Sequence, residues 1–281
     1  MGEKIRNIFK QGGNKKQKEI FFSARGLKKL IGEGLLNSNK AIFFPRSNEA
    51  GVLLLHGYTS TPYEFYDLSR YLANKGVSVY APTIAGHGTS PKDLANTSIE
   101  EWKKSVEEGY KFLKQKSKKV YVVGSSLGGN LALHLAHKFN ASVVSMGTPI
   151  HVRGQRFFKM FLYTYGWLKK NQKKHRINHK LANINKHQVV YTVMPIKSLR
   201  RFFSFISKIT IPNLKNIKSP ALIIQSISDK IVNPKSANYL KEHLGSIKKK
   251  ILWVNGKNHT LAIDDNRGKI FKAIYQFVSS N

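Results

Sequence analysis

The segment Gly-Ser-Ser-Leu-Gly at residues 124–128 contains a side chain that could do covalent chemistry. It has the form Gly-x-Ser-x-Gly and joins an apolar run, 120–123, to a segment with apolar residues at helical spacing, 127–139. A strained strand-to-helix turn of this kind exposes the serine hydroxyl, and the flanking glycines avoid Cβ clashes. The helix N-terminus that follows favours developing negative charge. We therefore predict Ser126 as a nucleophile, because the neighbouring Ser125 occupies an x position.

A serine nucleophile needs a base, and the base needs a carboxylate that orients it. For a serine on such a turn, the order along the chain is Ser, then Asp or Glu, then His. Between Ser126 and the last histidine of the chain only two carboxylates occur, Asp229 and Glu242. Asp229 follows the predicted strand 221–227, at the edge of the sheet where loops carry catalytic groups, whereas Glu242 lies within a predicted helix. We therefore predict Asp229 as the orienting acid.

Two histidines follow this acid and are candidates for the base. His243 lies inside the predicted helix near 235–244. His259 follows the predicted strand 247–254 and a turn that contains asparagine and glycine. This position at a strand end predicts His259 as the base.

The same chemistry requires hydrogen-bond donors for a developing oxyanion. One is predicted to be the backbone N–H of Leu127, immediately after the nucleophile. The other is predicted to be the backbone N–H of Tyr58, in the loop after the apolar run 52–56. His56, at the end of that run, is an alternative base, although a histidine there more often shapes the loop.

Strands and helices alternate along most of the chain, which predicts an α/β fold with a mostly parallel sheet and helices on both faces. The helix that begins near Ser98 carries a capping box with Glu101. Strands are predicted at 52–56, 77–81, 120–123, 142–146, 221–227 and 247–254, and helices at 63–75, 98–117, 127–139, 235–244 and 267–278.

Two segments do not follow this alternation. Residues 1–40 are basic and are predicted to form an N-terminal extension with a short amphipathic helix. Residues 149–213 are aromatic and basic and contain no acidic residue, which predicts a helical cap inserted into the core. The core is then formed by 41–148 and 214–281.

The composition limits the class of protein further. The chain has 281 residues, 41% of them hydrophobic, which is enough for one large domain with an insertion. It contains no cysteine, so thiolate metal sites and cysteine nucleophiles are excluded. The N-terminus lacks the apolar core of a signal peptide, and Arg6 stands where myristoylation requires Ser or Thr. No uncharged run reaches the ~18 residues of a membrane span. We therefore expect a cytoplasmic protein.

The chain is strongly basic, with 48 Lys and Arg against 15 Asp and Glu, a net charge of +33. Such a surface attracts polyanions, whether nucleic acid or anionic lipid headgroups. The lysines are spread along the whole chain, which favours an ordinary role in solubility over a binding stripe. We expect no specific nucleic-acid partner. Peripheral contact with the anionic inner surface of the membrane is the alternative role of this charge.

Four short segments of the chain form a combined pattern: Leu-Leu-Leu-His-Gly-Tyr-Thr at 53–59, Ala-Pro-Thr-Ile-Ala-Gly-His-Gly at 81–88, Ser-Leu-Gly-Gly at 126–129 and Ser-Asp-Lys-Ile-Val-Asn-Pro at 228–234. These segments resemble the small bacterial carboxylesterases and the monoacylglycerol lipase-like group of the α/β-hydrolase superfamily. The resemblance covers about 41–281, is weakest in the predicted insertion, and implies an α/β-hydrolase fold with a small helical cap. It also implies ester hydrolysis through an acyl-enzyme without metal or cofactor. Asn258 stands where this family usually has glycine before the histidine.

The predicted cap is rich in apolar side chains, and above the catalytic edge these would form an acyl-binding slot. Packing of the cap on the core is the alternative role for most of them. We expect a serine carboxylesterase for short- to medium-chain esters, including monoacylglycerols. A lactonase, thioesterase or lysophospholipase on the same three residues, and a non-catalytic protein that binds polyanions or membranes, are the alternatives. The apolar residues include Phe157, Phe158, Phe161, Tyr163, Trp167, Leu199, Phe202, Phe203 and Phe205.

Overall fold

The computed structural model describes residues 40–152, 171–173, 191, 193–256 and 258–281. The chain divides into two units between Ser38 and Asn39, and all described residues belong to the second unit. Nearly all of the predicted extension 1–40, and the apolar residues predicted between 157 and 168, lie outside the described residues. The predicted domain boundaries therefore stay predictions.

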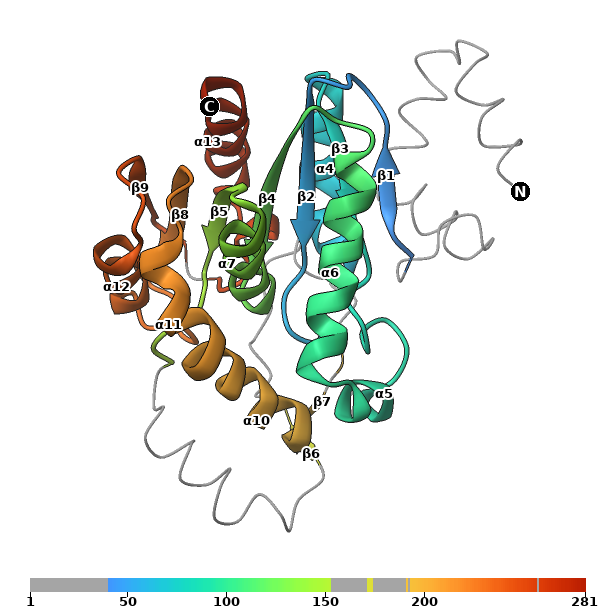
Figure 1. Cartoon of the computed structure of the whole chain (residues 1–281). Coiled ribbons are helices and arrows are strands. Elements are labelled where there is room, and N and C mark those ends of the chain that lie inside the picture. Colours follow the sequence, from blue (N-terminus) through green and yellow to red (C-terminus); the bar gives the residue numbers. More distant parts are fainter. Residues whose placement is uncertain (1–39, 153–170, 174–190, 192, 257) are drawn as a thin grey trace. The chain divides into compact units, whose positions relative to one another are not determined.

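A seven-stranded sheet in the order β1-β3-β2-β4-β5-β8-β9 forms the centre of this unit (Figure 1). All neighbouring strands are parallel except β1, which pairs antiparallel with β3. A separate antiparallel pair, β6 with β7, lies within the predicted insertion 149–213. The strands are β1 (Ile42–Phe44), β2 (Ala50–Leu55), β3 (Ser78–Ala81), β4 (Lys119–Ser125), β5 (Ser142–Met146), β6 (Asn171–Lys173), β7 (Val193–Pro195), β8 (Ala221–Ser226) and β9 (Lys249–Val254).

Helices cover both faces of the sheet, as the alternation of strands and helices predicted (Figure 1). Alternate residues of β2 show how the two faces separate. Leu53 and Leu55 join a core with α6, α7, α10 and α12, whereas Val52 and Leu54 join a core with α4 and α13. The helices are α4 (Tyr66–Asn74), α5 (Pro91–Asn96), α6 (Ile99–Lys114), α7 (Leu127–Phe139), α10 (Ile196–Phe205), α11 (Ile211–Asn213), α12 (Lys235–His243) and α13 (Arg267–Ser280).

Most predicted elements are confirmed, and local sequence explains their bounds. Helix α6 begins at a capping box in which Ser98 and Glu101 exchange side-chain and backbone hydrogen bonds. The predicted helix 63–75 is instead a 3-10 turn, Pro62–Phe65, followed by α4. The short β1 and α5, of 3 and 6 residues, were not predicted because such segments are too short to show periodicity.

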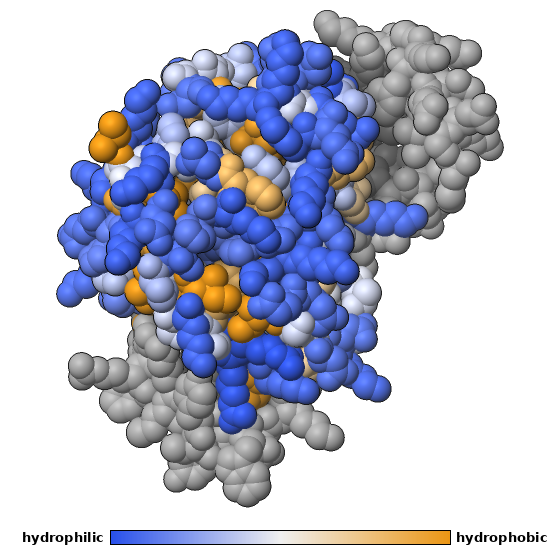
Figure 2. Space-filling model, viewed as in Figure 1, coloured by the Kyte–Doolittle hydropathy of each residue, from blue (hydrophilic) through white to orange (hydrophobic). Residues whose placement is uncertain are grey.

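The carboxyl end of β2 points toward the side of the sheet where α5 and α10 lie (Figure 1). The parallel β4, β8 and β9 end on the same side, so their following loops meet there. The face of the molecule in Figure 2 is mainly hydrophilic, with small separate hydrophobic areas. Among the helices that the structure describes, none is long and apolar enough to cross a membrane.

Candidate active site

Ser126 occupies a strained turn between β4 and α7. Its backbone has φ 54° and ψ −114°, a conformation that L-residues rarely adopt. A Cβ at Gly128 would lie 1.9 Å from the carbonyl oxygen of Leu55, and one at Gly124 would lie 2.0 Å from that of Gly128. Both glycines are therefore required by close backbone contact, which explains the Gly-x-Ser-x-Gly pattern.

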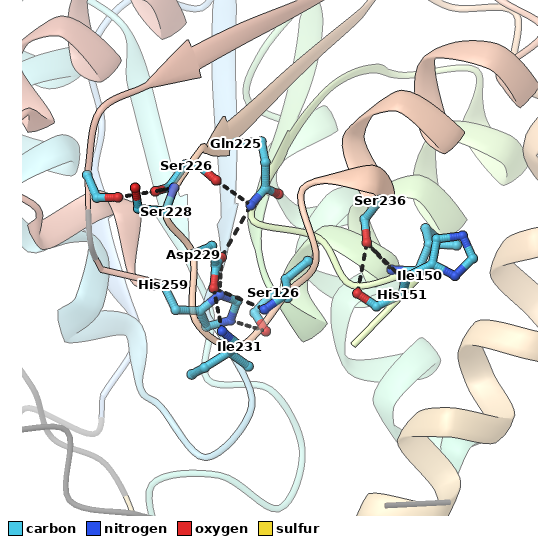
Figure 3. Close-up of polar contacts among 12 residues, drawn as sticks. Ser126, Ile150, His151, Gln225, Ser226, Ser228, Asp229, Ile231, Ser236 and His259 are labelled. Carbon is cyan, nitrogen blue, oxygen red and sulfur yellow. Dashed lines mark hydrogen bonds and ion pairs between the residues drawn. The ribbon is translucent and has the colours of Figure 1, made fainter. Parts of the chain in front are cut away.

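The structure brings Ser126, His259 and Asp229 together from three different strand ends (Figure 3). The distance from Ser126 Oγ to His259 Nε2 is 2.9 Å, and that from His259 Nδ1 to Asp229 Oδ2 is also 2.9 Å. Because a carboxylate only accepts hydrogen bonds, Nδ1 carries the proton and Nε2 presents its lone pair to the serine hydroxyl. This geometry allows His259 to remove the proton from Ser126.

Asp229 is fully buried, yet several donors stabilise its ionised form. Burial raises the pKa of the Asp229 carboxyl, but the His259 imidazole and the N–H groups of Ile231 and Val232 outweigh burial. The pKa is therefore held below its usual value, and the group is a carboxylate near neutral pH. Asp229 Oδ1 accepts from Ile231 at 2.8 Å and from Val232 at 3.0 Å, and these contacts leave Oδ2 aimed at the histidine.

Gln225 adds a further contact to the acid. Its Nε2 lies 3.3 Å from Asp229 Oδ2 and 3.2 Å from the carbonyl oxygen of Ser226, and its side chain is buried (Figure 3). The sequence analysis missed this residue. The available signal was its long polar side chain within the strand β8, directly after four apolar residues.

The loop that carries His259 is held by two side-chain hydrogen bonds. The hydroxyl of Ser226 donates to the carbonyl oxygen of Gly256. Asn258, which precedes the histidine, donates through Nδ2 to Asp264 Oδ2 at 2.9 Å. The asparagine that departs from the family pattern therefore fastens the histidine loop through a side chain that glycine lacks.

The two predicted oxyanion donors, the N–H groups of Tyr58 and Leu127, follow β2 and Ser126. Leu127 is the first residue of α7, so its N–H has no partner within the helix. Within the described part of the chain, neither N–H donates a hydrogen bond. Gly57 N–H, beside Tyr58, donates to Oε2 of the buried Glu64 at 3.0 Å. Glu64 is a second residue that the sequence analysis missed.

His56 does not have the geometry of a base. It is fully buried, its Nε2 accepts the N–H of Ile84 at 3.1 Å, and its Nδ1 lies 3.0 Å from the carbonyl oxygen of Gly57. The ring is thus neutral, with Nδ1 protonated and both nitrogens engaged. Burial first, and then the nearby His87, lower the pKa of His56 well below its usual value. His56 shapes the loop instead of taking a proton from Ser126.

The other weighed alternatives lie away from this site. Glu242 and His243 are both exposed on α12, and His243 Nδ1 bonds the carbonyl oxygen of Tyr239, on the same helix. Among the residues that the structure describes, no group of three or more His, Cys, Asp or Glu side chains could hold a metal ion.

The sheet order, the strand-to-helix turn and the serine on it define an α/β-hydrolase. The family model described as serine aminopeptidase, S33, matches residues 46–266, and the chain belongs to this family. Because the match spans most of the chain, it includes the loops after β2, β4, β8 and β9.

Two relatives and two solved structures agree with this assignment. A carboxylesterase from Bacillus subtilis (strain 168) is 27% identical over 235 residues, 83% of this chain and 94% of the relative. A thermostable monoacylglycerol lipase from Bacillus sp. (strain H-257) is 29% identical over 248 residues, 85% of this chain and 94% of the relative. A structure reported with the metagenome-derived lipolytic enzymes LipS and LipT has a TM-score of 0.80 at 22% identity, covering 88% of this chain and 99% of that chain. The monoacylglycerol lipase of Paleococcus ferrophilus has a TM-score of 0.71 at 20% identity, covering 86% of this chain and 98% of that chain. The two structures show the fold, and the relatives support an α/β-hydrolase of the esterase and lipase kind.

Proposed function

We propose that this protein is a serine carboxylesterase that hydrolyses short- to medium-chain carboxylic esters, monoacylglycerols among them. The observation that carries the proposal is the unbroken pair of 2.9 Å contacts from Ser126 Oγ through the His259 ring to Asp229. A buried carboxylate, an oriented imidazole and a serine on a strained turn are the parts that acyl transfer requires.

In the proposed mechanism, His259 Nε2 takes the proton of Ser126 as Oγ attacks the carbonyl carbon of the ester. The resulting oxyanion accepts hydrogen bonds from the N–H groups of Tyr58 and Leu127. The protonated His259 then gives its proton to the departing alcohol, which leaves an acyl group on Ser126. Water, deprotonated by the same Nε2, attacks the acyl-enzyme and releases the carboxylic acid. Every step uses groups of this chain and water, and we propose no cofactor.

Two observations support an apolar acyl group as the substrate's reacting part. Helix α10 of the insertion buries Leu199, Phe202, Phe203 and Phe205, and Phe202 stacks on the ring of Tyr58 beside the candidate oxyanion loop. Relatives over most of the chain are a carboxylesterase and a monoacylglycerol lipase. An apolar surface near the site favours acyl chains over bulky polar groups.

The test is hydrolysis of p-nitrophenyl esters across acyl lengths, together with 1-monoacylglycerols, lactones and thioesters. Ser126→Ala should lower kcat by about 10⁵- to 10⁶-fold on the best substrate. Ser125→Ala is the matched control and should keep kcat within about twofold of the wild type, because of these two neighbouring serines it is Ser126 that bonds His259 Nε2. Equal losses in both variants, or no turnover of any ester, would refute the proposal. Turnover confined to lactones or thioesters would assign the same residues to those substrates.

We propose a small-molecule ester as the partner of this site, in a cytoplasmic protein without a specific nucleic-acid partner. The net charge of +33 supports peripheral contact with anionic membrane surfaces. Co-sedimentation with vesicles of anionic and of zwitterionic lipid at physiological salt tests this contact. Equal recovery with both vesicle types would contradict it.

A further inference from the structure

Helix α10 contacts the predicted oxyanion loop through the buried hydroxyl of Ser198 and the ring of Phe202. We propose that Ser198 is a positioning residue for ester hydrolysis: by binding the Tyr58 side chain, it fixes the Tyr58 backbone N–H that receives the oxyanion. This inference rests on the proposed function, and it assigns to the insertion a part in transition-state stabilisation.

Hydrogen bonds tie the Tyr58 hydroxyl to the start of α10. Ser198 is completely buried, and its Oγ lies 2.5 Å from the Tyr58 hydroxyl in a contact where either group can be the donor. Both hydroxyls also lie within hydrogen-bond distance of the carbonyl oxygen of Pro195, Ser198 at 3.0 Å and Tyr58 at 3.3 Å. Burial raises the pKa of the Tyr58 hydroxyl, which keeps the group protonated.

Aromatic contacts hold the Tyr58 ring on two further sides. Phe202, one turn along α10 from Ser198, stacks on it with centroids 5.6 Å apart and an interplanar angle of 24°. The ring of His87, in the loop after β3, meets it edge-on at 6.3 Å. A side chain fixed at its hydroxyl and on two sides of its ring leaves little freedom to its own backbone.

The backbone at this position needs such support. Gly57 and Ser60 close a turn through a 3.1 Å hydrogen bond, and Thr59 within that turn has φ 62°. A β-branched residue in this left-handed region is strained by about 1–3 kcal/mol, and the conformation persists only where neighbouring groups impose it. The insertion supplies a second contact here, because the N–H of Tyr191 donates to the carbonyl oxygen of Thr59 at 3.0 Å.

The experiment compares Ser198→Ala, Tyr58→Phe and the double variant by kcat and KM per titrated active site. It also measures Ki for a trifluoromethyl ketone, which adds to Ser126 and forms a tetrahedral oxyanion. Each single variant should lower kcat and raise Ki by about three- to tenfold, less than the 10²–10³ expected for loss of a whole donor. KM should change by less than about twofold. The double variant should match Tyr58→Phe, because that variant alone already removes the contacts of the Tyr58 hydroxyl with Ser198 and Pro195.

Arg201→Ala is the matched control for simple loosening of α10. Arg201 Nη1 donates to the carbonyl oxygens of Ala95 at 2.7 Å and Thr97 at 2.9 Å, so it fastens α10 to α5 without touching Tyr58. This variant should melt at a lower temperature but keep kcat per titrated site within about twofold.

Three results would overturn the inference. The first is an unchanged kcat and Ki in both Ser198→Ala and Tyr58→Phe. The others are a double variant in which the two losses of kcat multiply, or an equal loss of kcat in Arg201→Ala. A wild type that neither hydrolyses esters nor binds the ketone would instead overturn the proposed function, and this inference with it. The wild-type measurements therefore test the function, and the variants test the role of Ser198.

Discussion

Four loops meet at one edge of the sheet, but they are held in place by different parts of the chain. Three of them follow β4, β8 and β9, and the fourth follows β2. Ser126, Asp229 and His259 are held by contacts from the sheet and its own loops, such as Gln225 on Asp229. The loop around Tyr58 is held on one side by Glu64 and on the other by the insertion. The groups proposed to transfer protons are thus held by the core, whereas the Tyr58 N–H proposed to bind the oxyanion lies in a loop that α10 contacts.

Because of this difference, substitutions in the core and in α10 should affect activity in different ways. Changes in the core should abolish proton transfer or the fold itself, and changes in α10 should give graded losses of transition-state stabilisation.

The largest expected effect is that of Gly128→Ala, which disrupts the packing of the Ser126 turn against the core. The added Cβ would lie 1.9 Å from the backbone carbonyl oxygen of Leu55, in a central strand that cannot yield. We expect a loss of more than about 4 kcal/mol in the free energy of unfolding, measured by urea denaturation. Gly76→Ala is the control: φ is 85° but a Cβ would meet nothing within 4 Å, so the cost should be about 1–2 kcal/mol. Similar stability of the two variants would contradict the close packing of the turn.

Asp229→Asn should lower kcat by about 10⁴-fold while the fold is kept. The amide cannot hold the proton on His259 Nδ1 as a carboxylate does, so Nε2 no longer presents its lone pair to Ser126. Steady-state kinetics on the best ester would measure this. The exposed Glu242→Gln serves as the control, and an equal loss there would remove Asp229 from its assigned role.

Asn258→Ala should lower kcat by about tenfold with little change in KM, because the loop that carries His259 loses its contact with Asp264. Asn213→Ala is the control, since the side chain of Asn213 donates within its own helical segment, at 2.8 Å, instead of to the histidine loop. In the double variant Asn258→Ala with Ser198→Ala, the two fold-losses of kcat should multiply, because the two residues support different loops of the site. A loss of kcat that differs from this product would mean that the two loops do not act independently.

The smallest effect concerns pH and the junction of α7 with α10, where His134 on α7 meets the ring of Phe205 on α10 edge-on. The pKa of His134 lies below its usual value, mainly because the ring is buried. Lys103 and Lys138 also lower this pKa, and Glu107 raises it without outweighing burial. The unfolded chain therefore binds this proton more readily, so stability declines as pH falls below about 6.5. His134→Gln should flatten this part of a plot of unfolding free energy against pH. Identical slopes in the two proteins would contradict the assignment.

Much of the fold and of the candidate site could be predicted from the sequence, because the signals are local. The strand at Ser142–Met146 and the helix at Leu127–Phe139 have the predicted bounds. The Gly-x-Ser-x-Gly pattern directly encodes a turn that excludes any Cβ at its two glycines. With only two carboxylates between the serine and the last histidine, elimination was enough to select Asp229, which the structure brings to His259.

The supporting residues could not be predicted, because their roles depend on contacts between distant parts of the chain. Glu64 resembled a solvated helical residue, and Ser198 an ordinary serine in a basic segment, until the fold buried both beside the loop after β2. In the sequence, His56 and His259 both lie at strand ends, and both carry an imidazole that could act as a base. Only the tertiary structure engaged both nitrogens of His56 and left Nε2 of His259 facing Ser126. The sequence by itself thus determined which residues could react, and packing decided which are aligned to do so, since alignment depends on hydrogen bonds that only the folded chain can form.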